Sequence, residues 1–308
     1  MILLAGLLLA ADVSVHGRVY SHYEQALSDS AGFSGFGISR AYLTVKATFP
    51  ENQHGLTTSI RITQDVARLA DLVRAPESSD VSVKNPYDAY LKYAYGKIAS
   101  KTGFFAIMGQ QPHPWVDYET GLWSFRFAQK VFTDRAHLLH SADLGVSLGY
   151  ENPWVQTQAM LVNGQGYKSS EIDRVPTLGA RVSLFPVALG ASSLRELGLH
   201  AYYQADTGHT TMIGAVSWGL EKNTGLMAQF VSQDDVRGFE AWAWLDVGRI
   251  MQTQSFGAVA RYEKLESSDY LMAGIFAKPA GGLSLSIDYQ AENQGDESVV
   301  SLHTQVKF

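Results

Sequence analysis

Basic side chains recur at alternate positions in the first hundred residues of the chain. In stretches where polar and apolar residues alternate, each of these side chains falls on the polar face. The five residues that we expect to form a basic wall are Arg18, Arg40, Lys46, Arg61 and Lys92. A guanidinium is always charged and offers a fork of N–H donors that matches a carboxylate or a phosphate. The spacing therefore predicts a surface that could bind anions.

Acidic side chains predominate on the corresponding polar faces later in the chain. The residues that we expect to form an opposite, acidic wall are Asp206, Glu240, Asp246 and Asp288, together with Asp143, Glu221, Glu263 and Glu292. Opposed charges across a narrow aqueous gap create a transverse field, which orients polar solutes and sorts ions. The alternative is that these positions are polar only because they contact water, and that the charge asymmetry has no function.

The residue types needed for catalysis or metal binding do not form a recognisable motif. The chain has no Cys, which excludes thiolate chemistry and disulfides, and it contains no G-x-S-x-G or H-E-x-x-H motif. His137 and His140 lie close together in sequence, but no third ligand accompanies them. Ser301 and His303 share a face of the last segment, which leaves a barrel enzyme as an alternative. We predict no catalytic residue, no metal and no cofactor.

Short strands are the elements that must position the charged residues. Between turns, apolar and polar residues alternate with the period of two that is typical of strands. In residues 37–49, for example, Leu43 and Val45 lie on one face and Lys46 lies on the other. About sixteen such segments cover the chain, and short turns mostly alternate with longer loops. This pattern predicts an all-β, antiparallel barrel.

The apolar faces of these strands need a cover that the sequence does not supply as helices. No amphipathic helix alternates with the strands, and no apolar run is long enough for a transmembrane helix. Lipid can cover these faces if the sheet closes, because closure pairs every edge N–H and C=O group. We therefore predict one transmembrane β-barrel domain over residues 12–308, with a water-filled lumen. The net charge of −6 argues against nucleic acid as a partner.

One segment, residues 110–140, interrupts the alternation and is predicted to fold into the lumen. This insert segment is both aromatic and charged, and a long insert of this kind is often functional. Its candidate residues are Trp115, Asp117, Tyr118, Glu119, Trp123, Arg126, Lys130 and Arg135. If the segment folds inward, Asp117 and Glu119 would lie opposite the basic wall. The alternative is a surface helix that packs on a soluble sheet.

Residues 1–11 form an apolar run that ends in small residues, MILLAGLLLAA. The run is similar to the core and cleavage site of a secretory signal, and we interpret it as the remnant of a signal peptide. It lacks the basic residues that normally precede such a core, and it is too short to span a bilayer as a helix. The alternative is a buried first strand.

Several motifs resemble those of bacterial outer-membrane porins. The last segment, SLHTQVKF, ends at Phe308 and is similar to the C-terminal signal that directs barrels to the outer-membrane assembly machinery. The order of strands resembles that of the 16-stranded porins, in which the loop after strand five folds inward and narrows the pore. That loop corresponds to residues 110–140. The stretch SRAYLTVKATFP also resembles the second strand of the phosphate-selective porin O/P family.

The resemblance implies a homotrimer in the outer membrane of a Gram-negative bacterium, in contact with outer-membrane lipid. It also implies a passive channel for small hydrophilic solutes or ions, and the basic wall adds an expected preference for anions. A protein of another class stays open: a barrel sheath that holds a partner such as an electron-transfer cytochrome. The sheath would need a wider barrel and an empty lumen, so an inward insert segment would favour the porin.

Overall fold

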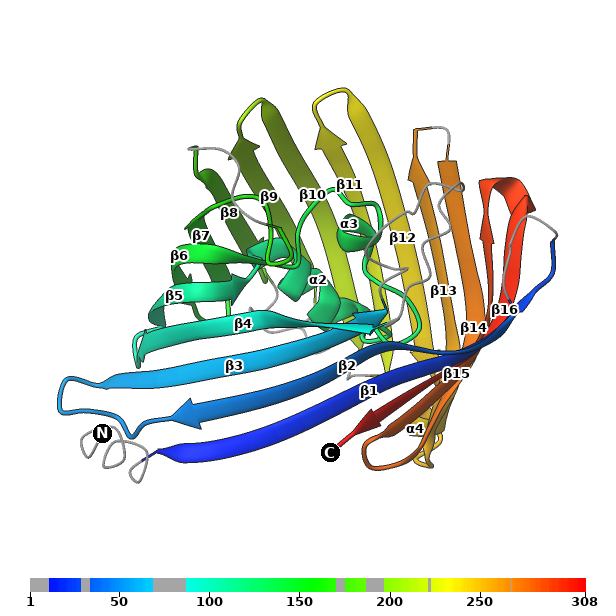
Figure 1. The fold of residues 1–308 in the computed structure, drawn as a ribbon, viewed down its shortest axis with the longest axis horizontal. Coiled ribbons are helices and arrows are strands. Elements are labelled where there is room, and N and C mark those ends of the chain that lie inside the picture. Colours follow the sequence, from blue (N-terminus) through cyan, green and yellow to red (C-terminus); the bar gives the residue numbers. More distant parts are fainter. Residues whose placement is uncertain are drawn as a thin grey trace.

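The chain forms a closed antiparallel barrel of sixteen strands in the computed structural model (Figure 1). The structure describes residues 11–28, 34–68, 87–169, 175–186, 197–220, 223–266 and 268–308. Every strand pairs with its neighbours in the sequence, and β1 closes the barrel by pairing with β16. The predicted sixteen-stranded barrel is therefore confirmed. Residues 1–10 of the interpreted signal remnant, and Glu221, lie outside the described residues.

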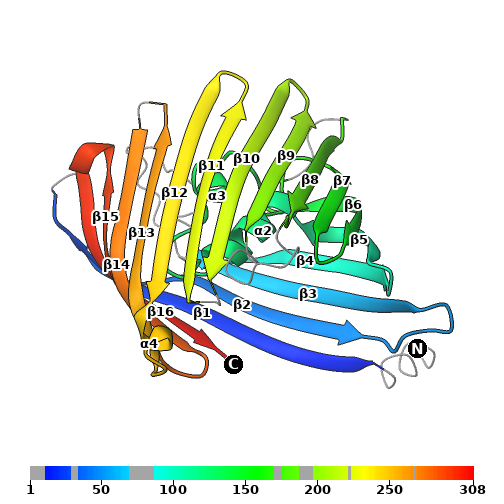
Figure 2. The same cartoon turned by 180° about the vertical axis from the view of Figure 1, so that it is seen from behind.

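The strands differ in length, and the first four are among the longest (Figure 1). Their bounds are β1 Asp12–Ala26, β2 Gly35–Thr48, β3 Leu56–Arg68, β4 Tyr87–Ser100, β5 Phe104–Pro112, β6 Ala142–Glu151, β7 Val155–Val162, β8 Thr177–Leu184, β9 Gly198–Asp206, β10 His209–Leu220, β11 Thr224–Gln233, β12 Val236–Asp246, β13 Ser255–Leu265, β14 Ser268–Ala280, β15 Leu283–Glu292 and β16 Glu297–Lys307. Figure 2 shows the wall formed by β9 to β16 from behind. The long β1 to β4 carry the predicted basic wall.

The strands present an apolar face to the outside, and their inner faces are polar except where they pack against the insert segment. In β8 the two faces alternate at every residue: Leu178 and Val182 are exposed, whereas Arg181 and Ser183 are buried. The same alternation exposes apolar side chains on the outer face of the other strands. Examples are Leu43, Ile62, Leu91, Val146, Met212, Phe230, Ile275 and Ile287. The outer surface is therefore apolar where a water-soluble barrel would be polar.

Helices are few and short. They are α2 Pro114–Trp123, α3 Phe132–Arg135, α4 Val247–Ile250 and the 3-10 helix η4 Asn293–Gly295. Among the described residues, none of the helices has the length and the apolar composition that crossing a bilayer requires. The alternation of apolar and polar residues in the sequence predicts a strand over residues 239–250, and its end at Ile250 is wrong. Asp246 ends β12 because its carboxylate accepts the Arg249 N–H (2.9 Å) and begins α4.

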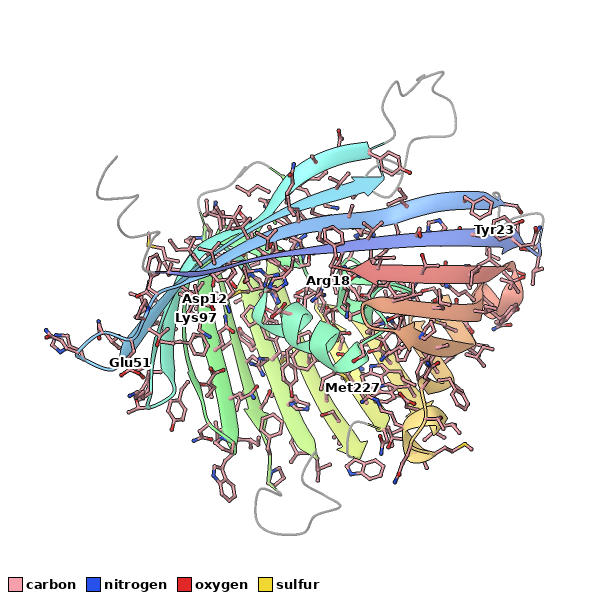
Figure 3. All side chains as sticks on the ribbon, turned by 90° about the horizontal axis from the view of Figure 1, so that it is seen from below. Asp12, Arg18, Tyr23, Glu51, Lys97 and Met227 are labelled. Atoms are coloured by element: carbon pink, nitrogen blue, oxygen red, sulfur yellow. The ribbon has the colours of Figure 1, made fainter. Side chains whose placement is uncertain are left out.

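The largest apolar cluster lies inside the barrel, around the insert segment. Trp115, Trp123 and Phe132 are each 0 % exposed, and they pack with inward side chains of β7 and β9–β14. In Figure 3, viewed along the barrel, α2 lies between Arg18 on one side and Met227 on the other. These contacts place the insert segment against the inner faces of the strands. Its first three residues extend β5 to Pro112, beyond the predicted end of that strand.

Candidate functional site

The insert segment begins with a helix whose start is fixed by local sequence. Pro114 occupies the first turn, where its missing N–H costs nothing, and the His113 ring caps the helix by accepting the Trp115 N–H (3.2 Å). Nε2 of His113 lies 3.0 Å from Oε1 of Gln204 on β9. Burial lowers the pKa of His113 to about 4, so the ring is neutral at pH 7 and can keep accepting. His113 therefore holds the start of α2 next to β9.

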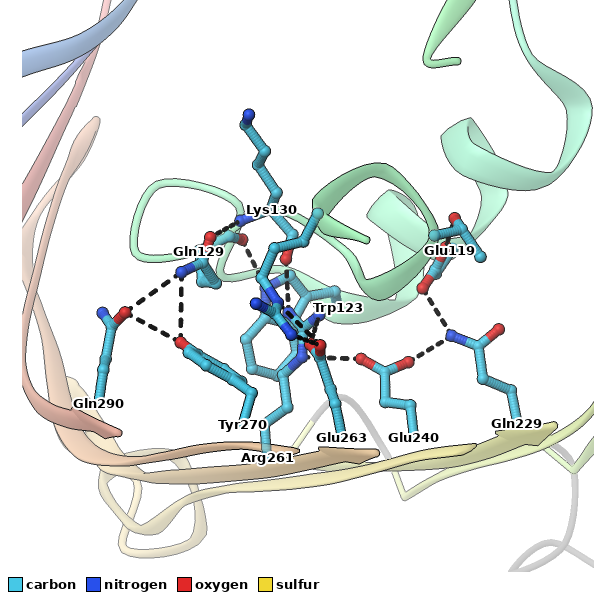
Figure 4. A network of polar contacts seen from close by, with 12 residues as sticks. Glu119, Trp123, Gln129, Lys130, Gln229, Glu240, Arg261, Glu263, Tyr270 and Gln290 are labelled. Atoms are coloured by element: carbon cyan, nitrogen blue, oxygen red, sulfur yellow. Dashed lines mark hydrogen bonds and ion pairs between the residues drawn. The ribbon is translucent and has the colours of Figure 1, made fainter. Parts of the chain in front are cut away.

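The rest of the insert segment is anchored to strands β11 to β15 by polar contacts (Figure 4). The Gln129 amide donates to the Tyr270 hydroxyl (3.3 Å) and to Oε1 of Gln290 (3.2 Å). Arg135 forms ion pairs with Glu263 and with Glu292, the latter at 2.9 Å. These anchors hold the segment against the wall that the sequence predicted to be acidic, and away from β1 to β4.

A buried cluster of charges joins the insert segment to that wall (Figure 4). Arg261 is 1 % exposed and pairs with Glu240 (2.8 Å) and with Glu263. Gln229 bridges the cluster to the insert segment, because its amide donates both to Glu240 and to Glu119 (2.6 Å). Glu240 is therefore compensated by a buried arginine and does not present a free charge to water.

Glu119 lies at the centre of this cluster. Its carboxylate accepts from the Thr133 hydroxyl and from Gln229. Burial raises the pKa of Glu119 to about 7, although both hydrogen bonds favour the ionised form. The carboxyl thus faces β11 to β13, whereas the sequence had placed it opposite the basic wall.

The basic wall and the insert segment enclose a cavity of about 340 Å³. Four of the five residues of the basic wall line it: Arg18, Lys46, Arg61 and Lys92. Arg126 of the insert segment adds a fifth cation, and Asp117 of α2 is the one carboxylate among the described lining residues. Burial raises the pKa of Asp117, and the nearby cations Arg61 and Lys92 oppose that shift. The side of the lumen next to β1–β4 is therefore strongly cationic.

The fifth residue of the basic wall, Arg40, does not line the cavity. It is 7 % exposed and forms a 2.9 Å ion pair with Asp65, which is fully buried. The Tyr167 hydroxyl donates to the same carboxylate oxygen of Asp65 (2.9 Å). Arg40 thus has a structural partner, whereas Arg18, Lys46 and Arg61 form no ion pair among the described residues.

The remaining predicted residues are spread over the lumen. Within the insert segment, Arg126 pairs with Asp134, whose pKa lies at about 2 because Arg126 and Lys130 outweigh its burial. The Tyr118 ring stacks on the Arg181 guanidinium (4.2 Å). Lys130 accepts from Arg261 through its backbone carbonyl (2.6 Å).

Of the predicted acidic wall, Glu240 and Glu263 share Arg261 as a partner, and Glu263 and Glu292 share Arg135. Asp288 lies 3.3 Å from His303, Asp246 caps α4, and Asp206 accepts the Thr207 N–H (2.6 Å). The Ser301 hydroxyl is buried without a hydrogen-bond partner among the described residues, so His303 does not activate it. Glu240, Glu263 and Glu292 are thus joined through shared arginines, whereas Asp206, Asp246 and Asp288 each form local contacts of their own.

The sequence-based list omitted two cations that organise the lumen, Arg261 and Arg181. Both could have been found, since the period of two in 255–264 places Arg261 on the same face as Glu263. The position of Arg126 at the cavity could not be predicted in the same way, because polar and apolar residues do not alternate in the insert segment.

Comparison with known proteins gives a match in structure alone. No family model matches the sequence, and no curated protein matches it. Salmonella typhi OmpF, solved in complex with daunomycin, has a TM-score of 0.66 and 11% identity, covering 97% of this chain and 98% of that chain. An engineered Rhodopseudomonas blastica porin has a TM-score of 0.61 and 12% identity, covering 96% of this chain and 100% of that chain. The chain therefore has the fold of these bacterial porins.

Proposed function

Starting from this porin fold, we propose that the protein is an outer-membrane channel through which small hydrophilic solutes diffuse, with a preference for anions. The apolar outer face supports a membrane location, because lipid is the one solvent that covers it without a second layer of protein. The polar inner face supports an aqueous path. The proposed location is the outer membrane of a Gram-negative bacterium.

The observation that carries the anion preference is the composition of the cavity beside β1 to β4. Five cations line it, namely Arg18, Lys46, Arg61, Lys92 and Arg126, and Asp117 is the one lining carboxylate among the described residues. Arg126 is paired with Asp134, which leaves four cations that form no ion pair among the described residues. An anion that enters this space exchanges water for guanidinium and ammonium donors, while a cation meets repulsion. Passage further requires that binding stays weak enough for release, and the cavity meets this need because its cations are spread over four strands and the insert segment.

We also propose that the insert segment is the constriction of this channel. Its anchors lie on β9 and β11–β15, and its free face, with Asp117 and Arg126, borders the cationic cavity. The path for solutes would then run between α2 and the basic wall. A filled lumen also counts against the sheath for a cytochrome, since the space that a protein partner would need holds Trp115, Trp123 and Phe132.

Three further features follow from the porin resemblance and are part of the proposal. They are a homotrimeric assembly, recognition of Phe308 by the outer-membrane assembly machinery, and a signal peptide of which residues 1–11 are the remnant. Outer-membrane lipid is the expected contact of the exposed apolar faces.

Ion selectivity tests the anion preference. We expect the triple variant Arg18→Gln, Lys46→Gln, Arg61→Gln to shift the reversal potential in a salt gradient toward cation selectivity, because three of the five lining cations are lost. The matched control is Lys101→Gln, Arg237→Gln, Lys264→Gln, which removes the same charge from exposed positions outside the cavity. Equal reversal potentials for the two triple variants would refute an anion path along the basic wall.

Removal of the segment 115–130 tests the constriction. We expect the single-channel conductance to rise and the selectivity to weaken together, because the gap beside the basic wall would open. The purified variant is first checked by circular dichroism for an intact barrel. An unchanged conductance in a folded barrel would mean that solutes take another path.

A further inference from the structure

A second cavity, of about 500 Å³, lies between the insert segment and strands β10 to β14. Its walls combine aromatic rings with polar and charged side chains. The rings that line it are Phe125 of the insert segment, Phe185, Trp218, Trp242 and Trp244. Phe125 packs edge-on against Trp244 at 6.3 Å between ring centroids. We call this space the aromatic pocket. A cavity of this size with aromatic rings and a small number of charged groups is typical of a small-molecule site.

Two indole N–H groups in the aromatic pocket have no hydrogen-bond partner among the described residues. They belong to Trp242, which is 5 % exposed, and to Trp244. Both nitrogen atoms are shielded from solvent, so these indole rings offer the pocket their apolar surface and not their N–H groups. Trp244 owes its position to Gly225 on the neighbouring strand. A side chain there would lie 2.3 Å from the Trp244 Nε1 atom.

The charges of the aromatic pocket favour an anionic acceptor. The lining includes Lys278, Arg249 and Asp246, which leaves one positive charge from two cations and one carboxylate. Asp246 is already engaged by the Arg249 N–H (2.9 Å) and by the Ser255 hydroxyl. Lys278 forms no ion pair within the described part of the chain, and its ammonium lies 6.0 Å from the Phe125 ring and 5.6 Å from the Phe276 ring. An ammonium held among rings gains from an anion beside it.

We propose that the aromatic pocket binds a small aromatic carboxylate, with its ring among Phe125, Trp242 and Trp244 and its carboxylate at Lys278. The ring would pack on faces that already prefer tilted and edge-on contacts. The carboxylate would accept from the Lys278 ammonium, which forms no ion pair within the described part of the chain. Neutral sugars fit less well, because the one acidic group that could accept their hydroxyls is occupied.

Benzoate is the probe for this site. Calorimetric titration of the purified barrel in detergent at pH 7.5 should show saturable binding of benzoate. Cyclohexanecarboxylate, which has the charge without the aromatic ring, and benzamide, which has the ring without the charge, should each bind at least several-fold more weakly. No saturable binding of benzoate, or equal binding of all three compounds, would overturn the proposal.

Two variants locate the binding. Lys278→Gln should weaken benzoate binding roughly tenfold, since it removes a charge-assisted hydrogen bond. Trp244→Phe, which keeps a ring but removes part of the stacking surface, should weaken it roughly threefold. Lys101→Gln makes the same charge change in an exposed turn and should leave binding unchanged. Unchanged affinity in folded Lys278→Gln would place benzoate elsewhere and refute this site.

The titration measures binding and not transport, so it can be separated from the channel proposal. A barrel that binds benzoate but conducts no ions would leave the aromatic pocket in place and remove the channel. A barrel that conducts anions selectively but does not bind benzoate would support the channel and refute the binding site in the aromatic pocket.

Discussion

The arginines of the lumen fall into two groups. Some are paired with buried carboxylates, and others form no ion pair among the described residues and can contact a solute. Arg40 and Arg261 are buried and paired with carboxylates, whereas Arg18 and Arg61 line a cavity without an ion pair among the described residues. The same residue type therefore has two roles, which depend on whether a neighbouring strand supplies an acid. The two-residue alternation along a strand predicts the face on which a side chain lies, but it does not predict the residue with which that side chain forms an ion pair.

Arg40→Gln should destabilise the barrel without a large effect on ion selectivity. The substitution leaves Asp65, which is fully buried, without its cation, and breaking a buried ion pair costs roughly 3 kcal/mol. Denaturant unfolding in detergent would measure the loss. Arg18→Gln, at a position with no carboxylate partner among the described residues, serves as the control and should lose much less. Similar losses in the two variants would mean that the ion pair with Asp65 contributes little.

Glu119 should make the stability of the insert segment depend on pH. Burial raises the folded-state pKa to about 7, above the usual value of 4.5, so the folded state favours the protonated carboxyl. Its contribution to stability is fully present below about pH 4.5 and is lost as pH rises through about 7. Each pKa unit corresponds to about 1.4 kcal/mol, so the loss is at most roughly 3 kcal/mol.

Glu119→Gln should remove this dependence, because the amide stays neutral at every pH. Thermal unfolding at pH 5 and at pH 8 gives the comparison. Wild type should be less stable at pH 8 by an amount that the variant does not show. Glu51→Gln, in an exposed turn, is the control. A pH effect of the same size in Glu119→Gln would assign it to other groups.

At the scale of elements, the strands could be predicted because almost every residue carries the signal. Lipid-facing and lumen-facing positions alternate, so each strand repeats its pattern four or more times, as in β8. The end of β12 was missed because Val247 continues the apolar alternation. A helix cap at Asp246 turns the chain there, and an acidic residue three positions before Arg249 is a weak signal by comparison.

The candidate site could be predicted only in part, for a physical reason. The basic wall lies on strands, where the period of two fixes the direction of each side chain, and four of its residues do share one cavity. The insert segment has no such period. Its path depends on long-range contacts such as Gln129 with Tyr270 and Glu119 with Gln229. Neither contact has a local sequence signal.

The junction between β5 and the insert segment depends on a glycine. Gly109 has a φ of 122°, and an added Cβ atom would lie 2.3 Å from the Ala94 carbonyl oxygen on β4. We expect Gly109→Ala to cost roughly 1–3 kcal/mol in unfolding free energy, through backbone strain and this contact. Gly96→Ala, on the neighbouring strand, meets no atom within 4 Å and is the control. Equal stability of the two variants would show that the junction adapts without cost.

At the scale of the whole molecule, closure depends on the pairing of β1 with β16. Phe308 extends this seam beyond β16, since its carbonyl accepts the Gly17 N–H (2.8 Å) and its N–H donates to the Gly17 carbonyl (3.1 Å). The Phe308 ring covers Gly17, where an added Cβ atom would lie 2.0 Å from the ring. The terminal residue therefore has a packing role in addition to its proposed recognition during assembly.

Deletion of Phe308 should reduce the amount of assembled barrel in cells, because it removes two seam hydrogen bonds and the ring together. Gly17→Ala keeps the terminal residue but displaces its ring, and it should give a smaller loss. The folded fraction in isolated membranes is the measurement. Normal levels after deletion would contradict both roles, and equal losses in the two variants would favour packing over recognition.

The seam also determines when folding can finish. It pairs Arg18 with Lys307, residues at opposite ends of the chain, so β1 has no partner on its outer edge until the last strand has been synthesised. Until that moment a growing sheet exposes two open edges, which are templates for pairing with other chains. Pairing across so long a loop is also slow, because the entropy of loop closure is lost before the contact forms. We expect the barrel to close only once β16 can pair with β1, and its open edges to need protection until then.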